Sequence, residues 1–506
     1  MSFPPMVARS CWYCREHAVR CIPSIALFLA TQRSFYPGAQ WRAAARLATI
    51  AGVLLSGCAT YQARPLAPQA RLELFEARRL EDPELRRYIT YHLAGPTATE
   101  SARPWDLTTL ILAAFYFSPE LDVARAQSGV SVAAIHTAGQ HPNPSLQIPL
   151  GYTSNAKDGE SPYTFGLGLD IPIETAGKRG YRVAQAQHLS EAARFRIGSV
   201  AWQVRSRVRK QLLALYAATG QAVSLDQQLA AQQQVVNMLD KRLAVGAVSE
   251  PEANHARANL VQRRLELGNA QRQIADARAQ LASTIGLPVV AMANVKFDFH
   301  IFERVALDLP ESAMRNRAVL NRADLLEALA DYEASQSVLQ LQIANQYPDI
   351  HLGPGYSFDA GSHKYSLQVS GISLPIFNHN RGPIAEATAR RIEMAARVDA
   401  RQMQAVNDID RAIENYRKAL ANLRLAGKLL SAQTRQQRTV QASFDAGKAD
   451  RLALTSAGLE LERQQLDQQQ ALIQVQQTIG DAEDAMQRPF SRQELRFEPN
   501  EGRTHP

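Results

Sequence analysis

Cysteine is almost absent from the body of this 506-residue chain, whose four cysteines lie at positions 11, 14, 21 and 58. No disulfide is therefore available beyond position 58, and the Cys11–Cys14 pair has no second half that would complete a metal site. Aromatic residues are scarce at 7%, and proline is missing from 178–245 and from 384–446. These absences disfavour a large compact interior and permit unusually long helices.

Motifs of catalysis and of cofactor binding are also missing. The run Gly177–Arg179 is not a phosphate-binding loop, because Pro172 stands where the first glycine belongs and Arg179 where Ser or Thr is needed. No H-E-x-x-H or G-x-S-x-G occurs. His136 and His141 are five residues apart, which is wrong for one helical face. We expect no enzyme activity, no cofactor and no resident metal.

A basic surface for nucleic acid is absent as well, although the formal net charge is +8. Residues 1–57 contain six arginines and one glutamate, a net of 6 − 1 = +5, which leaves 8 − 5 = +3 for the remainder. The remainder has no basic block, so nucleic-acid binding is disfavoured.

The N-terminal region has the pattern of an export signal. Arg42 and Arg46 precede a short apolar run that ends at Leu55 and is followed by Ser-Gly-Cys58. This pattern is typical of a secretory signal and is too short to span a bilayer. The run ending at Cys58 resembles the bacterial lipobox, which implies cleavage before Cys58 and acylation of its thiol. Ala59, rather than Asp, favours the outer membrane by the same analogy. An ordinary cleavage site with a chance cysteine is the alternative.

Four stretches alternate apolar and small or polar residues, at 146–153, 163–171, 350–358 and 365–370. Each has about the length with which a tilted strand crosses a bilayer. The alternation slips at Gly371, where we expect a β-bulge. The aromatic residues expected to form a girdle at the membrane interface are Tyr152, Tyr163, Tyr356, Phe358 and Tyr365.

The same alternation also fits a small soluble sheet with one buried face. The unusually clean apolar faces, with Gly, Ser, Thr and Gln opposite them, favour lipid on one side and water on the other. Four strands from one chain cannot close a barrel, and an open edge cannot lie in lipid. A membrane sheet therefore requires oligomerisation, with eight strands from two chains or twelve from three.

The proline-free stretch 178–245 predicts a helix of about 100 Å. Apolar or amide residues recur near its end at spacings of 4-3-4-3-4, as in coiled coils: Leu225, Leu229, Gln232, Val236, Leu239 and Leu243. The stretch after 383 has the same character and contains a Gln-rich segment at 464–477, where Leu and Ile spaced by seven argue against disorder.

These features occur twice. Pro144 and Pro348 precede the two strand pairs, Pro172 and Pro375 end them, and a glycine interrupts each helical stretch, at 246 and 447. The offsets are 204, 203 and 201 residues. A repeat of this length is a duplicated structural unit, here a β-hairpin joined to a very long helical hairpin.

This duplicated order, the junction strings Asp170–Gly180 and Leu374–Gly382, and the two glycine turns resemble the outer-membrane factor family of TolC-like outer membrane efflux proteins. The resemblance covers about 105–488, and the junction strings are most similar to the heavy-metal cation-efflux (CzcC-like) branch. It implies a mainly α membrane protein: a trimeric α-barrel of long coiled-coil helices, continued by a twelve-stranded outer-membrane β-barrel with four strands per chain.

The resemblance also implies a passive duct that performs no chemistry. It would export metal cations or toxic small molecules that an inner-membrane, proton-driven RND-type pump delivers through a periplasmic adaptor protein. The expected partners are two further copies of the chain, the adaptor, the pump and outer-membrane lipid. The alternative from another class is a lipid-anchored periplasmic coiled-coil adaptor or scaffold without a channel, although adaptors usually have one helical hairpin rather than two.

The resemblance places the adaptor-docking tip at the two glycine turns, with Arg242, Leu243, Gly246, Ser249, Phe444, Gly447 and Lys448. Family members often carry an acidic pair after the second turn glycine. Here Asp450 alone is acidic in that stretch and comes earlier, so we expect aperture charge from Asp450, Glu250 and Glu252.

The expected organisation follows from the repeat. Residues 1–57 form an extension and lipoprotein signal peptide, and 58–104 a lipid-anchored linker. The first repeat is 105–300, with strands at about 145–171 and a helical hairpin at about 178–286. The second is 301–488, with strands at about 350–374 and a hairpin at about 383–488, before a tail at 489–506.

Overall fold

The computed structural model describes residues 59–94, 104–155, 159–305, 316, 318–359 and 361–490. The chain divides into two units, Met1–Pro68 and Gln69–Pro506. The second unit contains nearly all of the described structure, and the account below concerns this unit.

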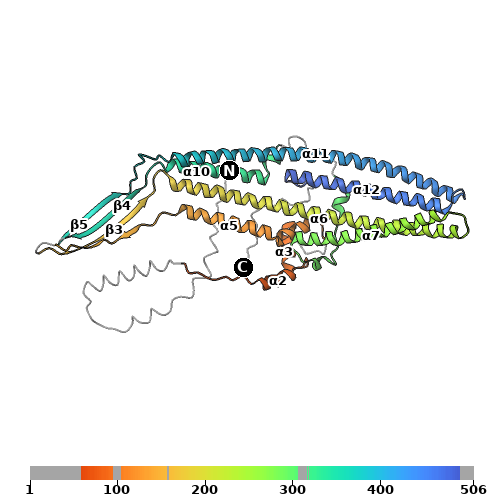
Figure 1. The fold of residues 1–506 in the computed structure, drawn as a ribbon, viewed down its shortest axis with the longest axis horizontal. Helices are drawn as coiled ribbons and strands as arrows, with labels where there is room; N and C mark the ends of the chain where they lie inside the picture. Colours follow the sequence, from red (N-terminus) through yellow and green to blue (C-terminus); the bar gives the residue numbers. More distant parts are fainter. Residues whose placement is uncertain are drawn as a thin grey trace, which may run out of the picture. The chain divides into compact units, whose positions relative to one another are not determined.

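Long helices and one small sheet make up this unit (Figure 1). In the first repeat the elements are α4 (Leu107–Phe117), α5 (Pro119–Gly139), β1 (Ser145–Gln147), β2 (Leu150–Tyr152), β3 (Tyr163–Ile173), α6 (Lys178–Ala244) and α7 (Glu250–Ile285). In the second they are α10 (Ala323–Ala344), β4 (Ile350–Asp359), β5 (Ser362–Ser370), α11 (Arg381–Asp445) and α12 (Arg451–Met486). The shorter elements are α2 (Pro68–Glu76), α3 (Pro83–Ala94), the 3₁₀ helix η2 (Val289–Met292) and α8 (His300–Glu303).

The long helices have the lengths that their missing prolines predict. α6 has 67 residues and α11 has 65, so each extends about 100 Å at 1.5 Å per residue. α7 and α12 return antiparallel to them and have 36 residues each. In Figure 1 the sheet lies at one end of these helices and the two turns, α6–α7 and α11–α12, lie at the other.

Both strand pairs join into one antiparallel sheet. The strand order is β1–β3–β4–β5, with β2 also paired to β3. β3 and β4 connect the repeats, with Leu167 opposite Tyr356 and Ile171 opposite Leu352. The first strand, expected to be continuous, is divided at Pro149, which has no backbone N–H to donate to the ladder. β1 and β2 together therefore occupy one strand position, and the chain supplies four.

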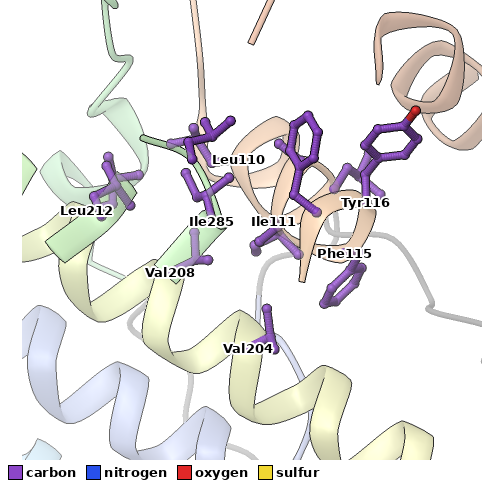
Figure 2. Close-up of a cluster of buried hydrophobic side chains, with 14 of the residues drawn as sticks. Leu110, Ile111, Phe115, Tyr116, Val204, Val208, Leu212 and Ile285 are labelled. Carbon is purple, nitrogen blue, oxygen red and sulfur yellow. The ribbon is translucent and has the colours of Figure 1, made fainter. Parts of the chain in front are cut away.

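The main core lies about halfway along the long helices. α4 is buried along almost its whole length and packs against α6 and α7. Figure 2 shows this cluster, in which Leu110 and Ile111 of α4 meet Val204 and Val208 of α6 and Ile285 of α7. Asp106 caps the start of α4 by accepting a hydrogen bond from the amide of Thr109, at 2.8 Å. The short helix α4 thus completes a hydrophobic core in the middle of the unit.

Among the described residues, no single helix combines the length and apolar character needed to cross a membrane. The helices α4 and α5 meet the length and apolar criteria only when taken together, and they are bent by 53° where they join.

Candidate functional site

One face of the sheet is a continuous apolar surface. The register places Phe165 beside Phe358 and Leu167 beside Tyr356, so the apolar residues of all strands share this face. Its side chains are exposed at the edges of the sheet in particular, with Leu150 at 77% and Leu367 at 71%. The opposite face carries glycines, serines and the pair Asp170–His351, whose carboxylate and Nδ1 are 3.0 Å apart. A sheet that is apolar on one side and polar on the other suits a boundary between lipid and water.

The expected girdle aromatics come together at the end of this face that is distant from the helices. Ring centroids of Tyr152 and Tyr163 are 5.4 Å apart, and those of Tyr356 and Tyr365 are also 5.4 Å apart. Phe358 stacks on Phe165 at 5.5 Å. These distances are in the range of favourable aromatic pairs.

The junction between sheet and α6 is held by a polar cluster. Lys178 begins α6 after Gly177, whose φ of +72° suits glycine. The Nζ of Lys178 donates to the carboxylate of Asp349 at 2.8 Å and to the carbonyl of Tyr347 at 2.7 Å. The amide of Thr175 also donates to Asp349 at 3.0 Å. These hydrogen bonds lower the pKa of the Asp349 carboxyl despite its partial burial. The cluster fixes the first repeat against the second at the sheet.

The two turns at the other end have the same geometry. In the first, the amide of Gly246 donates to the carbonyl of Leu243 and that of Ala247 to the carbonyl of Arg242. In the second, Gly447 donates to Phe444 and Lys448 to Ser443. Both are Schellman motifs, which need a left-handed residue, and Gly246 and Gly447 have φ of +71° and +69°. The turns are repeat copies to the level of individual hydrogen bonds.

The residues that begin the returning helices differ between the turns. Ser249 caps α7 and Asp450, its repeat counterpart at 249 + 201, caps α12. Asp450 also accepts a hydrogen bond from Arg242 at 2.7 Å, so one turn is bridged to the other. The amide of Ala453 and the guanidinium of Arg242 both lower the pKa of the Asp450 carboxyl.

The structure therefore gives Asp450 a neutralising partner within the chain, which the sequence does not reveal. Glu250 and Glu252 lie exposed in the first turn of α7, and neither forms an ion pair within the part of the chain that the structure describes. Of the three carboxylates expected at the aperture, only Asp450 has an ion-pair partner among the described residues.

A buried polar cluster joins α6 to α12 and was not anticipated from the sequence. Arg205 and Arg209 both approach the Glu483 carboxylate, at 3.0 and 3.3 Å. All three side chains are at most 7% exposed. Arg209 also donates to the backbone carbonyl of Gln476 at 2.8 Å. Beside them, Asp484 accepts a hydrogen bond from the indole of Trp202 at 3.1 Å, and burial raises the pKa of the Asp484 carboxyl.

We call this cluster, consisting of Arg205, Arg209, Gln476 and Glu483, the α6–α12 clamp. Its two arginines precede Gln476 and Glu483 by 267 to 278 residues, and nothing in their local sequence pattern distinguishes them. The clamp fixes α12, from the second repeat, against α6, from the first. Arg209 lies 33 residues before Arg242 (242 − 209), whose ion pair with Asp450 joins the two turns.

Two further expectations concern the lipidation site Cys58 and the binding of metal ions. Cys58 lies outside the described residues. Within the described part of the chain, no group of three or more His, Cys, Asp or Glu side chains is arranged to hold a metal ion.

Comparison with known proteins identifies this architecture. The family model described as outer membrane efflux protein matches residues 113–287 and 314–486. The cobalt-zinc-cadmium resistance protein CzcC of Cupriavidus metallidurans is 23% identical over 383 residues, which cover 74% of this chain and 85% of the relative. The pyoverdine export outer membrane protein OpmQ of Pseudomonas aeruginosa is 23% identical over 435 residues, which cover 76% and 90%.

Solved structures share the fold. An outer membrane protein of Vibrio cholerae, VceC, superposes with a TM-score of 0.62 at 19% identity and covers 76% of this chain and 97% of its own. CusC superposes with a TM-score of 0.62 at 17% identity, covering 85% and 99%. The open state of the Neisseria gonorrhoeae channel MtrE gives 0.64 at 16% identity, covering 78% and 94%. The mainly helical fold with a small sheet, expected from the sequence, is thereby confirmed.

Proposed function

We propose, from the premise that this chain belongs to the outer membrane efflux protein family, that it is the outer-membrane duct of a tripartite efflux system. The family is one of channels rather than of enzymes, and its members lie in the outer membrane and extend into the periplasm. The finer proposal concerns the assembly, the partners and the substrate.

The observation that carries the proposal is the amphipathic sheet with two open edges at one end of the long helices. One face is apolar and exposed, the other is polar, and the edge positions, β1/β2 and β5, pair on one side only within the described residues. Open edges cannot lie in lipid, because their N–H and C=O groups would have no partner. A lipid-anchored adaptor or scaffold would not need this sheet. Further copies that close it into a barrel satisfy every backbone group.

The helices support the same assembly. α10 packs between α6 and α11, whereas its counterpart α5 packs on α6. The far side of α5 exposes Val123 and Val130, and α11 exposes Ile392 and Met403. By repeat equivalence, α5 would lie against α11 of a neighbouring copy, which would cover these apolar side chains. Three copies, with four strand positions each, give twelve strands and a bore wide enough for water.

For substrate and partners we propose metal cations or toxic small molecules, delivered by a proton-driven RND-type pump through a periplasmic adaptor that docks at the two turns. The support comes from the relatives, one named for cobalt, zinc and cadmium resistance and the other for pyoverdine export. The two names point to a duct that passes what the pump selects. Exposed Glu250 and Glu252 near the turns favour cations.

Single-channel conductance in a planar bilayer tests the duct. We expect the purified protein to conduct, with a preference for cations that falls in the double variant Glu250→Gln, Glu252→Gln. Glu266→Gln, in a half-buried ion pair with Arg263 within α7 and distant from the turns, is the control. A protein that inserts but never conducts would support the scaffold alternative.

We also propose that Cys58 carries a lipid. Labelled fatty acid should be absent from Cys58→Ala while the fold, followed by circular dichroism, is unchanged. Label retained on that variant would refute acylation at this thiol.

A further inference from the structure

Most of the polar face of the sheet carries no charge, because glycine, serine, threonine and glutamine supply most of its residues. Asp359 and Lys364 form an ion pair at the tip, 3.0 Å apart. Asp170 of β3 and His351 of β4 form the other charged pair of the described strands on this face, near the end that joins the helices. Their side chains are 27% and 33% exposed. An ion that moves along this face therefore meets few coordinating groups, and this pair is among them.

Glycines leave the pair uncovered. Gly168 and Gly353 are its neighbours on the same face of β3 and β4. The imidazole lies against Gly371, where a Cβ would be only 2.6 Å from the ring. The ring therefore occupies space that a larger residue at 371 would fill. Imidazole and carboxylate thus project from a part of the wall that has almost no side chains.

The hydrogen bond between the two side chains determines which ring nitrogen can bind a cation. Nδ1 of His351 lies 3.0 and 3.1 Å from the two carboxylate oxygens of Asp170. A carboxylate only accepts, so Nδ1 carries the proton and donates it. In the neutral ring the lone pair is then on Nε2, which forms no hydrogen bond with the described part of the chain. Histidines that bind metals are commonly oriented by a carboxylate in this way.

We infer that Nε2 of His351 is a transient contact for divalent transition-metal cations that move along the polar face, with Asp170 as its positioning residue. The inference rests on the proposed duct, in which this face lines the bore. Imidazole nitrogen is a favourable ligand for Zn²⁺, Co²⁺ and Ni²⁺, whereas Mg²⁺ and Ca²⁺ prefer oxygen. The pair would therefore distinguish transition metals from the abundant alkaline-earth ions.

The contact should be weak, because the chain supplies few ligands. Asp349 lies two residues before His351, but its carboxylate accepts hydrogen bonds from Lys178 and from the amide of Thr175. Water must then complete the coordination of a metal bound at Nε2. Weak binding suits conduction, since an ion that enters a site in a channel must also leave it.

The second repeat junction does not reproduce the pair. The counterpart of Asp170 is Ser373 (170 + 203), and that of His351 is Gln147 (351 − 204). An assembly of three chains therefore has three pairs, separated by four strand positions. At about 4.8 Å per strand this is about 19 Å, so each pair acts alone and no shared high-affinity site arises.

Single-channel recording with Zn²⁺ tests the contact. We expect Zn²⁺ at millimolar concentration to reduce the conductance of the unaltered protein reversibly, and Mg²⁺ at the same concentration to have little effect. His351→Gln copies the residue at the equivalent place in the first repeat. In this variant and in Asp170→Asn, the Zn²⁺ concentration for half of the effect should rise at least about tenfold.

His363→Gln is the matched control. His363 is also exposed and lies on the neighbouring strand β5, but its Nδ1 contacts the hydroxyl of Tyr356 rather than a carboxylate, at 2.6 Å. Its removal should leave the Zn²⁺ effect unchanged. An effect that survives in His351→Gln, or one that disappears in His363→Gln, would overturn the assignment to His351.

The unaltered protein provides a test without substitutions. Diethyl pyrocarbonate acylates unprotonated imidazole, and mass spectrometry of proteolytic fragments measures the reaction at each histidine. In detergent, Zn²⁺ should slow acylation of His351 several-fold relative to Mg²⁺ and leave that of His363 unchanged. Equal rates at His351 with the two metals would overturn the contact.

The two readouts separate this inference from the proposed function. If the protein conducts but Zn²⁺ neither reduces conductance nor protects His351, the metal contact is wrong and the duct stands. If the protein never conducts, the proposed function fails, and the role of the pair in ion passage fails with it.

Discussion

The two repeats have nearly identical elements but bury them very differently. α6 and α11 differ by two residues in length, yet twenty residues of α6 are buried against six of α11. α6 is covered by helices of both repeats, α5 and α7 from its own and α10 and α12 from the other. α11 is covered by α10 and α12 of its own repeat. One chain therefore contains one complete junction between its repeats, and the proposed assembly would form the equivalent junction between neighbouring chains.

The junction inside the chain has features that its expected counterpart between chains lacks. The α6–α12 clamp pairs Arg205 and Arg209 with Glu483. The repeat counterpart of Glu483 is Ala282 (483 − 201), and the counterpart of Arg209 is Ala412 (209 + 203). At the turns, the counterparts of Arg242 and Asp450 are Ser443 and Ser249. Ion pairs hold the repeats together within a chain, and the residues at the equivalent positions, among them Ala282, Ala412 and Ser249, cannot form the same pairs between chains of the proposed assembly.

Removing the charge of the clamp should have the largest effect. Glu483→Gln leaves two buried guanidinium groups without their carboxylate, and breaking a buried pair in this way costs about 3–5 kcal/mol. Chemical denaturation of the protein in detergent measures this loss in the free energy of unfolding. Glu460→Gln, at an exposed position of the same helix, should be nearly neutral.

Replacing the three charged residues of the clamp together sharpens this result. Arg205→Leu, Arg209→Leu, Glu483→Leu removes all three charges, and replacement of buried ion pairs by packed apolar residues is often neutral or stabilising. The triple variant should be much more stable than Glu483→Gln. If both are equally destabilised, the loss comes from packing rather than from uncompensated charge.

The next largest effect concerns Gly480, where the repeats again differ. Its counterpart is Ala279 (480 − 201), and a Cβ at Gly480 would lie 2.5 Å from Nη1 of Arg209. Gly480→Ala should therefore destabilise by about 1–2 kcal/mol, because overpacking outweighs the gain in helix propensity. Gly458→Ala, in open space on the same helix, should instead stabilise by up to about 1 kcal/mol. A stabilised Gly480→Ala would show that Arg209 moves aside without cost.

Substitution of the turn glycines, Gly246 and Gly447, tests a feature that the two repeats share. Gly246→Gln with Gly447→Gln forces left-handed backbone onto non-glycine residues, at about 1 kcal/mol each, without a steric clash. We expect the assembly to survive and adaptor docking to fail, measured as loss of adaptor pull-down and of efflux in cells. Gly268→Gln, in a helical and open position of α7, is the control. Unchanged efflux in the double variant would remove the turns from the docking site.

The smallest energetic effect is expected at the Arg242–Asp450 bridge, which is exposed and therefore contributes no more than about 1 kcal/mol. Asp450→Ser copies the first repeat, keeping a helix cap while removing the charge. Conductance should rise in this variant. Ser443→Arg with Ser249→Asp adds the missing bridge between chains, and conductance should fall. The opposite changes would show that the link between the two turns does not limit conductance.

Acid should act on the same bridge. The pKa of Asp450 is lowered by Ala453 and Arg242, so the bridge's contribution is fully present above the ordinary value of 3.8 and is lost as pH falls through the lowered one. Conductance of the unaltered protein should increase only as the pH falls below 3.8, and that of Asp450→Ser should not. An equal acid response in both would assign it to other groups.

Much of this architecture was predictable from the sequence because its signals are local and repeated. Missing prolines predict α6 and α11, strict alternation predicts β3 to β5, and Gly246 and Gly447 predict the turns. The expected bulge at Gly371 agrees with its positive φ. Pro149 interrupts the first strand, since its ring removes a ladder donor that alternation alone does not consider.

The contacts between repeats were not predictable in the same way. Pairing of β3 with β4, the clamp, and the neutralisation of Asp450 by Arg242 all join residues more than 170 positions apart. A single Arg on a helix is usually a solvated charge, and no local pattern distinguishes Arg209 from its exposed neighbours. Such contacts depend on how two helices face one another, which periodicity does not specify.

The central claim is that the junction left incomplete in one chain is completed by two further copies. The mass of the protein in detergent micelles, measured by light scattering or native mass spectrometry, tests it most directly. The account predicts a mass of three chains, with no substantial population of single chains. A stable monomer or dimer would contradict it, because fewer than twelve strands would leave the sheet edges open or the bore filled by side chains.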